Sequence, residues 1–284
     1  SRAFYFGGLV SLVFAVSLII INPTTQPAKG NYKLHAIDVG QADSWFFQTP
    51  NGTGVLIDGG GQPVGNFDVG EHVVSPVLWE LGFRTIDLIV ATHADADHME
   101  GLLAVADNFD VKEIYLKIPD QPPPLLKKLL HLARMENIKI STFSEREVRD
   151  FEEFSISFFA PPDKPFRGKD SSNNNSAIAR FSFPNGSFLI TGDSEIPALS
   201  RVARIYGNRL RSKILMTPHH GSKDALYLPF LEAVSPQIAL AGVGKRNIFG
   251  FPHHSVKTKY AQQGIKLLRT DESGMISILF DSDK

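Results

Sequence analysis

The sequence predicts an α/β fold in which two mixed β-sheets pack face to face and helices cover their outer faces. Strand-like segments come first in hairpins with tight turn signals, and further along the chain they alternate with helix-like segments. The chain has 284 residues, enough to bury one large core. An uncharged apolar stretch at the start predicts one additional element, a transmembrane helix ahead of this fold.

The apolar stretch covers residues 3–21, nineteen residues without a charge. At about 1.5 Å of rise per residue, a helix of this length nearly crosses the ~30 Å hydrocarbon core of a bilayer. Proline at position 23 then ends the helix. A cleaved signal peptide or a buried core helix are the alternatives, although no small-residue cleavage site follows. We therefore expect a transmembrane helix at 1–22, a linker at 23–30 and a folded domain at 31–284.

The sequence of the folded domain predicts eleven strands and five helices, each bounded by turn or capping residues. In chain order, we expect strands at 33–39, 44–48, 54–58, 86–91, 113–116, 154–159, 177–183, 187–191, 213–216, 237–241 and 276–280. We expect helices at 72–81, 101–106, 125–136, 196–206 and 256–263. Asn51-Gly52 and Asn185-Gly186 predict hairpin turns, and Gly82 predicts the end of the first helix.

Composition limits the chemistry of any site. The 29 basic and 30 acidic residues nearly balance, so no global positive field indicates a nucleic-acid partner, although a local one stays possible. The chain has no cysteine, which excludes disulfides and thiolate metal ligands. Any metal must therefore be held by His, Asp or Glu.

The segment THADADH, residues 92–98, holds the densest group of potential ligands and follows the buried strand predicted at 86–91. A pair of divalent metals is the simplest arrangement that satisfies two imidazoles and two carboxylates at a strand end. A solvated acidic loop with helix-capping aspartates is the alternative, but it leaves the two histidines unexplained. The candidate ligands are His93, Asp95, Asp97 and His98.

Three further segments place carboxylates or histidines after predicted strands. Asp193 either bridges two metals or caps the following helix. Asp58 is suited to orient a ligating histidine. His219 and His220 follow the strand at 213–216, beside a glycine turn. A weaker signal is the pair at 253–254, which an ordinary surface loop would also explain.

The motifs and their order along the chain resemble those of the metallo-β-lactamase-fold hydrolases. Within that family, they resemble the C-terminal domain of ComEC-type DNA-uptake channel proteins. The resemblance runs from about residue 32 to residue 278. It implies a four-layer αββα sandwich and two divalent metal ions. The motifs that carry it are Asp38-Val39-Gly40-Gln41-Ala42-Asp43-Ser44, Leu56-Ile57-Asp58-Gly59-Gly60, Gly70-Glu71, His93 to His98, Asn174-Asn175-Ser176, Thr191-Gly192-Asp193, Pro218-His219-His220-Gly221-Ser222 and Asn247 to His253.

The sequence also departs from the pattern that it resembles. Asp95 stands where the wider superfamily has a second His, and Phe251 stands where ComEC-like domains usually have a His. Ala42 replaces a usual Gly, and the Asn174-Asn175-Ser176 segment occupies the place of another expected His. The site is therefore rich in oxygen donors, which shifts the expected metal toward manganese or magnesium relative to zinc.

The resemblance implies hydrolysis of phosphodiester bonds by metal-activated water. His93 and Asp95 are expected to hold one metal, and Asp97 and His98 the second. Asp97 is also expected to be one of the catalytic residues. Asp193 is expected to lie between the metals. His219 or His220 completes the second metal, and the other of the pair, or His253, donates a proton to the leaving oxygen.

Two supporting sets complete the expected site. The carboxylates expected to orient the ligands are Asp38, Asp43 and Asp58. The residues expected to contact substrate are Asn174, Asn175, Ser176, Ser222, Lys223 and Arg246. Local positive charge for a phosphate backbone comes from Lys223, Lys245 and Arg246 and from Arg167 and Lys169 before Asn174, although ordinary solvated loops would also explain these residues.

We therefore expect a nuclease that degrades the non-transported strand during DNA uptake, with single-stranded DNA as its partner. We expect it to be joined to a membrane channel of the same longer protein, on the outer face of the cytoplasmic membrane. A small phosphodiesterase or phosphocholine-type esterase is the first alternative. The second is a non-catalytic domain that guides DNA and has a decayed metal site, which the missing His positions would favour.

Overall fold

The computed structural model describes residues 31–62, 67–168 and 171–280. The transmembrane helix expected at 3–21 and the linker after it lie outside these ranges, so both stay predictions. Within the described ranges, no helix is long and apolar enough to cross a bilayer.

Hydrophobic strands form two sheets of seven strands each. In the first sheet, the neighbouring pairs from β16 through β1 and β2 to β3 are antiparallel. The neighbouring pairs from β3 through β5 and β7 to β8 are parallel. The order is β16 (Ile276–Phe280), β1 (Tyr32–Ala36), β2 (Trp45–Gln48), β3 (Gly54–Ile57), β5 (Leu88–Val90), β7 (Glu113–Leu116) and β8 (Lys139–Thr142).

The second sheet mixes directions in the same way. It is parallel from β15 to β12 and antiparallel from β12 to β9. The order is β15 (Lys266–Arg269), β14 (Ile238–Ala241), β13 (Ile214–Met216), β12 (Gly186–Ile190), β11 (Ile178–Phe183), β10 (Ser155–Ala160) and β9 (Val148–Asp150). Two short strands, β4 (Thr85–Ile86) and β6 (Asp110–Val111), form a separate parallel pair.

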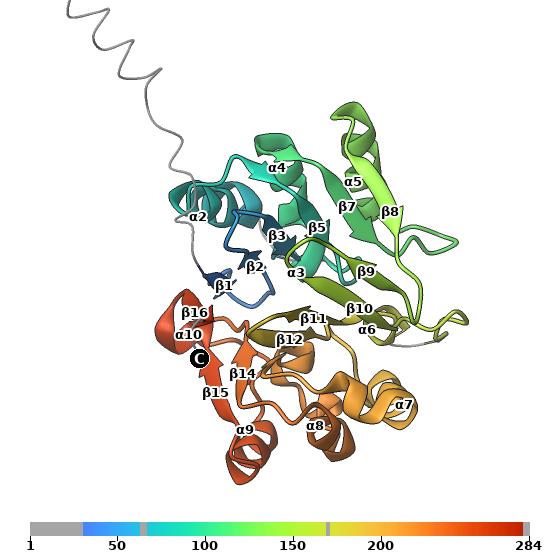
Figure 1. Ribbon diagram of the computed structural model, residues 1–284, viewed down its shortest axis with the longest axis vertical. Helices are drawn as coiled ribbons and strands as arrows, with labels where there is room; N and C mark the ends of the chain where they lie inside the picture. The colour runs from blue at the N-terminus through green and yellow to red at the C-terminus, as the bar shows by residue number, and fades with distance from the viewer. Residues whose placement is uncertain (1–30, 63–66, 169–170, 281–284) are drawn as a thin grey trace, which may run out of the picture.

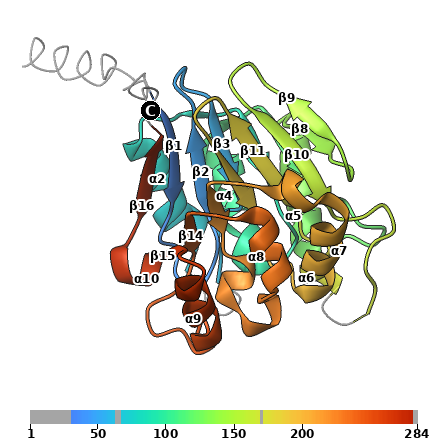
Figure 2. The same cartoon turned by 60° about the horizontal axis from the view of Figure 1, so that its bottom comes forward.

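Helices cover the outer face of each sheet, so the layers run helix, sheet, sheet, helix (Figures 1 and 2). On the first sheet lie the π-helix η1 (Gly70–Val74), α2 (Ser75–Glu80), α3 (Ala96–Met99), α4 (Gly101–Asn108) and α5 (Pro124–Met135). On the second lie α7 (Ile196–Tyr206), η2 (Gly207–Leu210), α8 (Leu228–Val234) and α9 (His254–Gln262). Shorter helices are α6 (Ser171–Asn174), η3 (Pro218–Gly221), η4 (Lys223–Ala225) and α10 (Thr270–Ser273).

The layer between the two sheets is rich in phenylalanine. Phe181 and Phe188 stack with ring centroids 4.5 Å apart, and Phe47 meets Phe188 edge to face. All three side chains are fully buried. Aromatic pairs in these geometries add roughly 0.5–1.5 kcal/mol each beyond the area that they bury. This central core fixes the two sheets against each other, and therefore fixes the positions of their strand ends.

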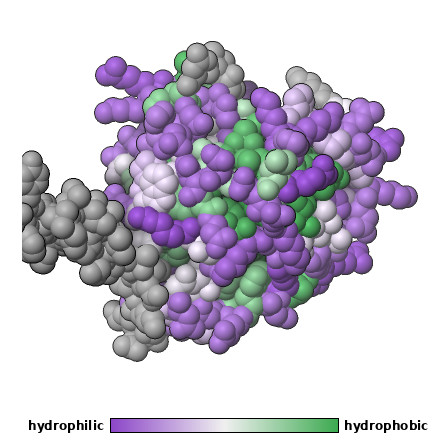
Figure 3. All heavy atoms as spheres, turned by 90° about the horizontal axis from the view of Figure 1, so that it is seen from above, coloured by the Kyte–Doolittle hydropathy of each residue, from purple (hydrophilic) through white to green (hydrophobic). Residues whose placement is uncertain are grey.

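The outer surface is that of a globular domain. Viewed from the side of α4 and α5, hydrophilic side chains cover most of the surface and apolar ones show between them (Figure 3). Exposed apolar residues that are scattered singly are normal for such a surface.

The predicted four layers are confirmed, and most predicted elements lie within two or three residues of the observed ones. The predicted helix at 196–206 and the strands at 113–116 and 276–280 match the observed bounds. Both predicted hairpins are antiparallel pairs, although the second turn is Pro184-Asn185, because Phe183 pairs with Gly186. The prediction missed β8, β9, β15 and α8, together with the short strand β6 and the short helices α3, α6, η2, η3, η4 and α10.

Candidate metal centre

Chain segments from both sheets end at one edge of the sandwich. β3 and β5 run parallel in the first sheet, and β12, β13 and β14 run parallel in the second, so their carboxyl ends meet there. β1 runs in the same direction as β3, because both pair antiparallel with β2. The candidate residues that follow these strands are Asp43, Asp58, His93 to His98, Asp193, His219 and His220.

His98 is held from behind by a carboxylate at the end of a neighbouring strand. Its Nδ1 donates to Asp58 Oδ2 at 2.8 Å, and both side chains are fully buried. Asp58 also accepts from the backbone amide and the hydroxyl of Thr92, at 2.8 and 2.7 Å. A carboxylate behind a ligating imidazole fixes its tautomer and its orientation. His98 Nε2 is therefore directed away from Asp58 and into the cluster.

His220 is held in the same manner from the other sheet. Its Nδ1 donates to the carbonyl of Gly242 at 2.9 Å and lies 3.3 Å from Asp43 Oδ1. An added Cβ at Gly242 would lie 2.3 Å from Asp43 Oδ1, so this close approach requires glycine. Asp43 therefore lies behind His220, although one of its oxygens is within 4.8 Å of ligand atoms of His98, Asp193 and His220.

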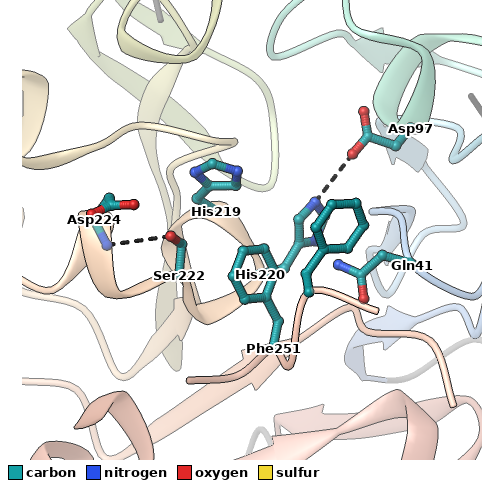
Figure 4. A pocket seen from close by; sticks show the side chains of 8 residues that line it. Gln41, Asp97, His219, His220, Ser222, Asp224 and Phe251 are labelled. Carbon is teal, nitrogen blue, oxygen red and sulfur yellow. Dashed lines mark hydrogen bonds and ion pairs between the residues drawn. The ribbon is translucent and has the colours of Figure 1, made fainter. Parts of the chain in front are cut away.

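Two carboxylates face these two imidazoles. Asp193 Oδ1 lies 3.1 Å from His98 Nε2 and 3.5 Å from His220 Nε2. Asp97 Oδ2 lies 3.4 Å from His220 Nε2, and Figure 4 shows the His220 ring turned toward Asp97. The structure thus brings together His98, His220, Asp97 and Asp193, from three separate chain segments.

Several polar atoms of this group are buried without a hydrogen bond. They are His98 Nε2, His220 Nε2, Asp193 Oδ1 and, close by, His93 Nε2. Each of these atoms lies within ion-pair distance of a neighbouring side chain but forms no hydrogen bond, and a buried polar atom without one costs roughly 1–3 kcal/mol, so a shared cation would satisfy them together. Two imidazole nitrogens and two carboxylates are donors that a divalent transition metal accepts. The residues therefore fit the divalent metal that the sequence predicts here.

The charges of the group reinforce one another. Burial lowers the pKa of His98, but the carboxylates of Asp193 and Asp58 outweigh burial and raise that pKa well above its usual value. Burial would raise the pKa of Asp193, but the charges of His98 and His220 lower it well below its usual value. A metal that binds here must displace the imidazole protons, so its binding is coupled to proton release.

A second group of donors lies beside the first and is more open. His93 Nε2 is 3.6 Å from Asp95 Oδ2, and the His93 and His98 rings are 4.2 Å apart. Asp95 accepts a hydrogen bond from the Ser172 hydroxyl at 2.7 Å, and its side chain is 43 % exposed. The nearby His93 imidazole lowers the pKa of Asp95, so this carboxylate is ionised at neutral pH.

His219 lies at the mouth of the cluster. Its Nε2 is 3.6 Å from Asp193 Oδ2, and its Nδ1 is 3.2 Å from Glu195 Oε1. His219 and His220 both have positive φ angles, of 46° and 51°, which non-glycine residues rarely adopt. Asp58, with φ 55°, shares this strained conformation. Strain of this kind persists where the surrounding structure holds a functional group in place.

The structure does not bring every predicted residue to the cluster. Asp38 is exposed and accepts a hydrogen bond from the Gly40 amide, which is a turn contact. His253 forms the N-cap of α9, where its Nδ1 accepts from the backbone amide of Ser255 at 3.3 Å. His219, whose Nε2 lies 3.6 Å from Asp193 Oδ2, is therefore better placed than His253 to act as the proton donor.

The Asn174-Asn175-Ser176 segment also serves the fold. Asn174 Oδ1 accepts from the Ala198 amide in α7, and Asn175 binds backbone atoms of Phe166. Ser176 is fully buried. These contacts hold the segment against α7, and they do not support the substrate contacts predicted for its side chains.

The remaining predicted residues lie on one side of the cluster. A cavity of about 360 Å³ opens there, lined by Gln41, Asp97, His219, His220, Ser222, Asp224, Phe249 and Phe251 (Figure 4). Lys223 and Arg246 are exposed neighbours of these residues in the chain. Ser222 is buried, and its hydroxyl accepts from the amide of Asp224 at 3.2 Å.

Sequence reasoning missed four residues that shape the site. Thr92 and Ser172 hold carboxylates, Glu195 holds His219, and Gly242 holds His220. Glu195 had a usable signal, since it follows the strand-ending Gly192-Asp193. The other three act through backbone or hydroxyl groups, which carry no distinctive pattern.

Comparison with known proteins agrees with this geometry. A family model described as the metallo-beta-lactamase superfamily matches residues 37–245. The ComE operon protein 3 of Bacillus subtilis is 30 % identical over 84 % of this chain, and competence protein ComA of Neisseria gonorrhoeae is 28 % identical over 84 %. The chain spans only about a third of these relatives, 32 % and 31 % of their lengths.

Solved structures share the fold. The metallo-beta-lactamase fold protein YhfI from Bacillus subtilis has a TM-score of 0.57 at 11 % identity, covering 88 % of this chain and 100 % of its own. The diiron β-hydroxylase CmlA from Streptomyces venezuelae has a TM-score of 0.54 at 15 % identity, covering 87 % of this chain and 54 % of its own. At these identities the likeness concerns the fold alone.

Proposed function

Because this chain belongs to the metallo-beta-lactamase superfamily, we propose that it is a metal-dependent phosphodiesterase that acts on single-stranded DNA. The observation that carries the proposal is the group of buried donor atoms without hydrogen bonds at the joined strand ends. One of the relatives named above is described as a competence protein, and the other as a protein of the ComE operon. This supports DNA as the substrate, and a role in degrading the non-transported strand.

The two groups of donors differ in burial and in composition, and this difference affects which metals we expect each to bind. His98, His220, Asp97 and Asp193 would hold one metal, while His93 and Asp95 would hold another, with Asp193 between the two. The second group is more exposed and richer in oxygen, which favours manganese or magnesium over zinc. Tight stoichiometric zinc in unsupplemented protein would count against this preference.

When bound, a divalent metal supplies Lewis acidity and lowers the pKa of its water. The chain supplies orientation and proton handling. Asp58 and the Gly242 carbonyl fix the two imidazoles, so the donors need little rearrangement. His219 is partly exposed to the cavity and is held by Glu195, so it is placed to give a proton to the leaving oxygen.

Phosphate backbone binding would come from exposed cations beside the cavity, namely Lys223, Lys245 and Arg246. We place the domain in a longer protein with a membrane channel, on the outer face of the cytoplasmic membrane. Support for this placement comes from the length of the relatives and from the apolar stretch at 3–21.

The test compares turnover of single-stranded DNA with turnover of two small phosphodiesters, bis-p-nitrophenyl phosphate and p-nitrophenyl phosphorylcholine. We expect kcat/KM to be higher for DNA than for the small esters. We also expect DNA binding to weaken steeply as salt rises: the logarithm of the binding constant should fall with the logarithm of the salt concentration, with a slope of about −0.7 per phosphate contacted. A flat salt response together with faster turnover of a small ester would instead establish a small-molecule esterase.

A further inference from the structure

The loop from Lys245 to Phe251 presents an unusual surface beside the cavity. Ile248 is 93 % exposed and Phe249 is 59 % exposed. Among the exposed large hydrophobic residues of the described ranges, only these two are adjacent in the sequence. Adjacent exposed apolar side chains at the mouth of a polar site indicate a binding surface more than a chance exposure.

Hydrogen bonds to a single side chain hold this loop in shape. Asn247 donates to the carbonyls of Gly244 and Phe251, at 3.1 and 2.8 Å, and accepts from the Phe251 amide at 2.8 Å. The exposed side chains are therefore presented by a defined backbone. A surface that is already ordered loses little conformational entropy when a ligand binds.

The aromatic rings of the loop form a series that leads to the cluster. Phe249 stacks on Phe251 with ring centroids 5.6 Å apart and planes 22° apart. Phe251 in turn meets the His219 ring edge to face at 5.7 Å. Phe249, Phe251 and His219 all line the cavity. A planar group that extended this series outward would lie directly beside the proposed proton donor.

The charge around the rings identifies the class of ligand. Lys245 and Arg246 begin the loop, and Lys223 lies between two lining residues of the cavity. All three are exposed, and Asp224 is the one carboxylate that lines the cavity besides Asp97. Flat apolar faces combined with flanking cations match a nucleobase with its phosphates.

We propose that Phe249, backed by Phe251, is a stacking platform for a base of single-stranded DNA next to the scissile phosphate. The inference rests on the proposed nuclease function and adds a source of substrate selection to it. Stacking on a ring face requires an unpaired base, so the platform would favour single strands with little regard to sequence.

A membrane surface is the other occupant that exposed Ile and Phe beside cations would fit. The position of the loop argues against it. The described chain begins at the far end of β1, and the candidate ligands follow the near end, about 17 Å away for a strand of five residues. The loop therefore lies at the end of the sandwich opposite to the one where the described chain begins.

The test compares a labelled oligothymidylate with an abasic oligomer of equal length, in cleavage and in binding by fluorescence anisotropy. We expect the wild-type chain with Mn²⁺ to prefer the oligothymidylate on the order of 10-fold. Phe249→Ala and Phe249→Leu should bring this ratio close to one, while Phe249→Trp should keep it. Met135→Ala, equally exposed on α5, is the control and should leave the ratio unchanged.

Each outcome decides one of the two proposals. A wild-type ratio near one, or a ratio that Phe249→Ala leaves unchanged, overturns the platform whether or not the chain is a nuclease. A preference in binding without cleavage of either oligomer supports the platform and rejects the nuclease. Loss of binding to phosphatidylglycerol vesicles in Phe249→Ala, with the base preference intact, assigns the loop to a membrane.

Discussion

At the scale of single residues, the site depends on groups that orient the ligands. Asp58 adopts a conformation that is unfavourable for a non-glycine residue and accepts three hydrogen bonds, from Thr92 and His98. The Gly242 carbonyl has the same function for His220. These partners direct the Nε2 atoms of both imidazoles toward the same two carboxylates.

Replacing Asp58 tests this role. Asp58→Asn should lower metal affinity about 10- to 100-fold, because an amide orients the imidazole less strongly than a carboxylate does. Isothermal titration with Mn²⁺ measures the affinity. Asp87→Asn is the matched control, since Asp87 also accepts a backbone hydrogen bond in this sheet but lies at the opposite edge. Equal affinities in both variants and the wild type would reject the role.

Sequence reasoning found most of these residues because their motifs are local. Residues 92–98 lie in one segment, and Asp58 and Asp193 each follow an apolar strand. It left His219 and His220 undecided, because neighbouring residues with positive φ send their rings in directions that no periodicity predicts. It also assigned roles to Asp38, His253 and Asn175, whose turn, cap and loop contacts depend on the folded backbone.

At the scale of elements, an ion pair joins the edge strand of the second sheet, β9, to the next-to-last strand of the first sheet, β7. Arg149 in β9 donates to both carboxylate oxygens of Glu113 in β7, at 2.8 and 2.6 Å. The Tyr115 hydroxyl also donates to Glu147, between the same two regions. The hydrogen bonds from Arg149 lower the pKa of Glu113 to about 2.

This lowered pKa predicts a pH-dependent stability. A carboxylate with a depressed folded-state pKa stabilises the fold above its unfolded pKa, here 4.5, and the contribution is lost as pH falls from 4.5 toward about 2. Glu113→Gln should lower the free energy of unfolding by roughly 1–3 kcal/mol at pH 7, measured by urea denaturation. The exposed Glu232→Gln is the control. A difference from wild type that persists unchanged at pH 3 would contradict the prediction.

The elements that sequence reasoning missed share a physical cause. Every residue of β8 and of β15 is at least partly exposed, so neither shows a buried apolar run. The helix α8 has only seven residues and begins next to a proline, so its periodicity covers about two turns. Elements that depend on their neighbours for burial carry weak local signals.

At the scale of the whole molecule, the candidate ligands come from both sheets. His93 to His98 follow a strand of the first sheet, while Asp193 and His220 follow strands of the second. A bound metal would therefore link the two halves of the sandwich. The fold class was predictable because hairpins and strand–helix alternation are local patterns, whereas the pairing of strand ends across sheets is not.

Metal removal should then lower the melting temperature. A ligand that binds only the folded state stabilises it by about 2.7 kcal/mol at a hundredfold excess over Kd. Thermal unfolding with chelator and with added Mn²⁺ measures the difference, and Asp193→Ala, which lacks the shared carboxylate, should not respond to the metal. A wild-type melting temperature that is independent of metal would show that no metal joins the halves.

The most direct test of the central claim is cleavage of a labelled single-stranded oligonucleotide by metal-free protein titrated with Mn²⁺. We expect no cleavage before metal is added, cleavage that saturates as metal binds, and a loss of at least about 100-fold in Asp193→Asn. Metal bound at this cluster without any cleavage, or cleavage that Asp193→Asn leaves intact, would contradict it.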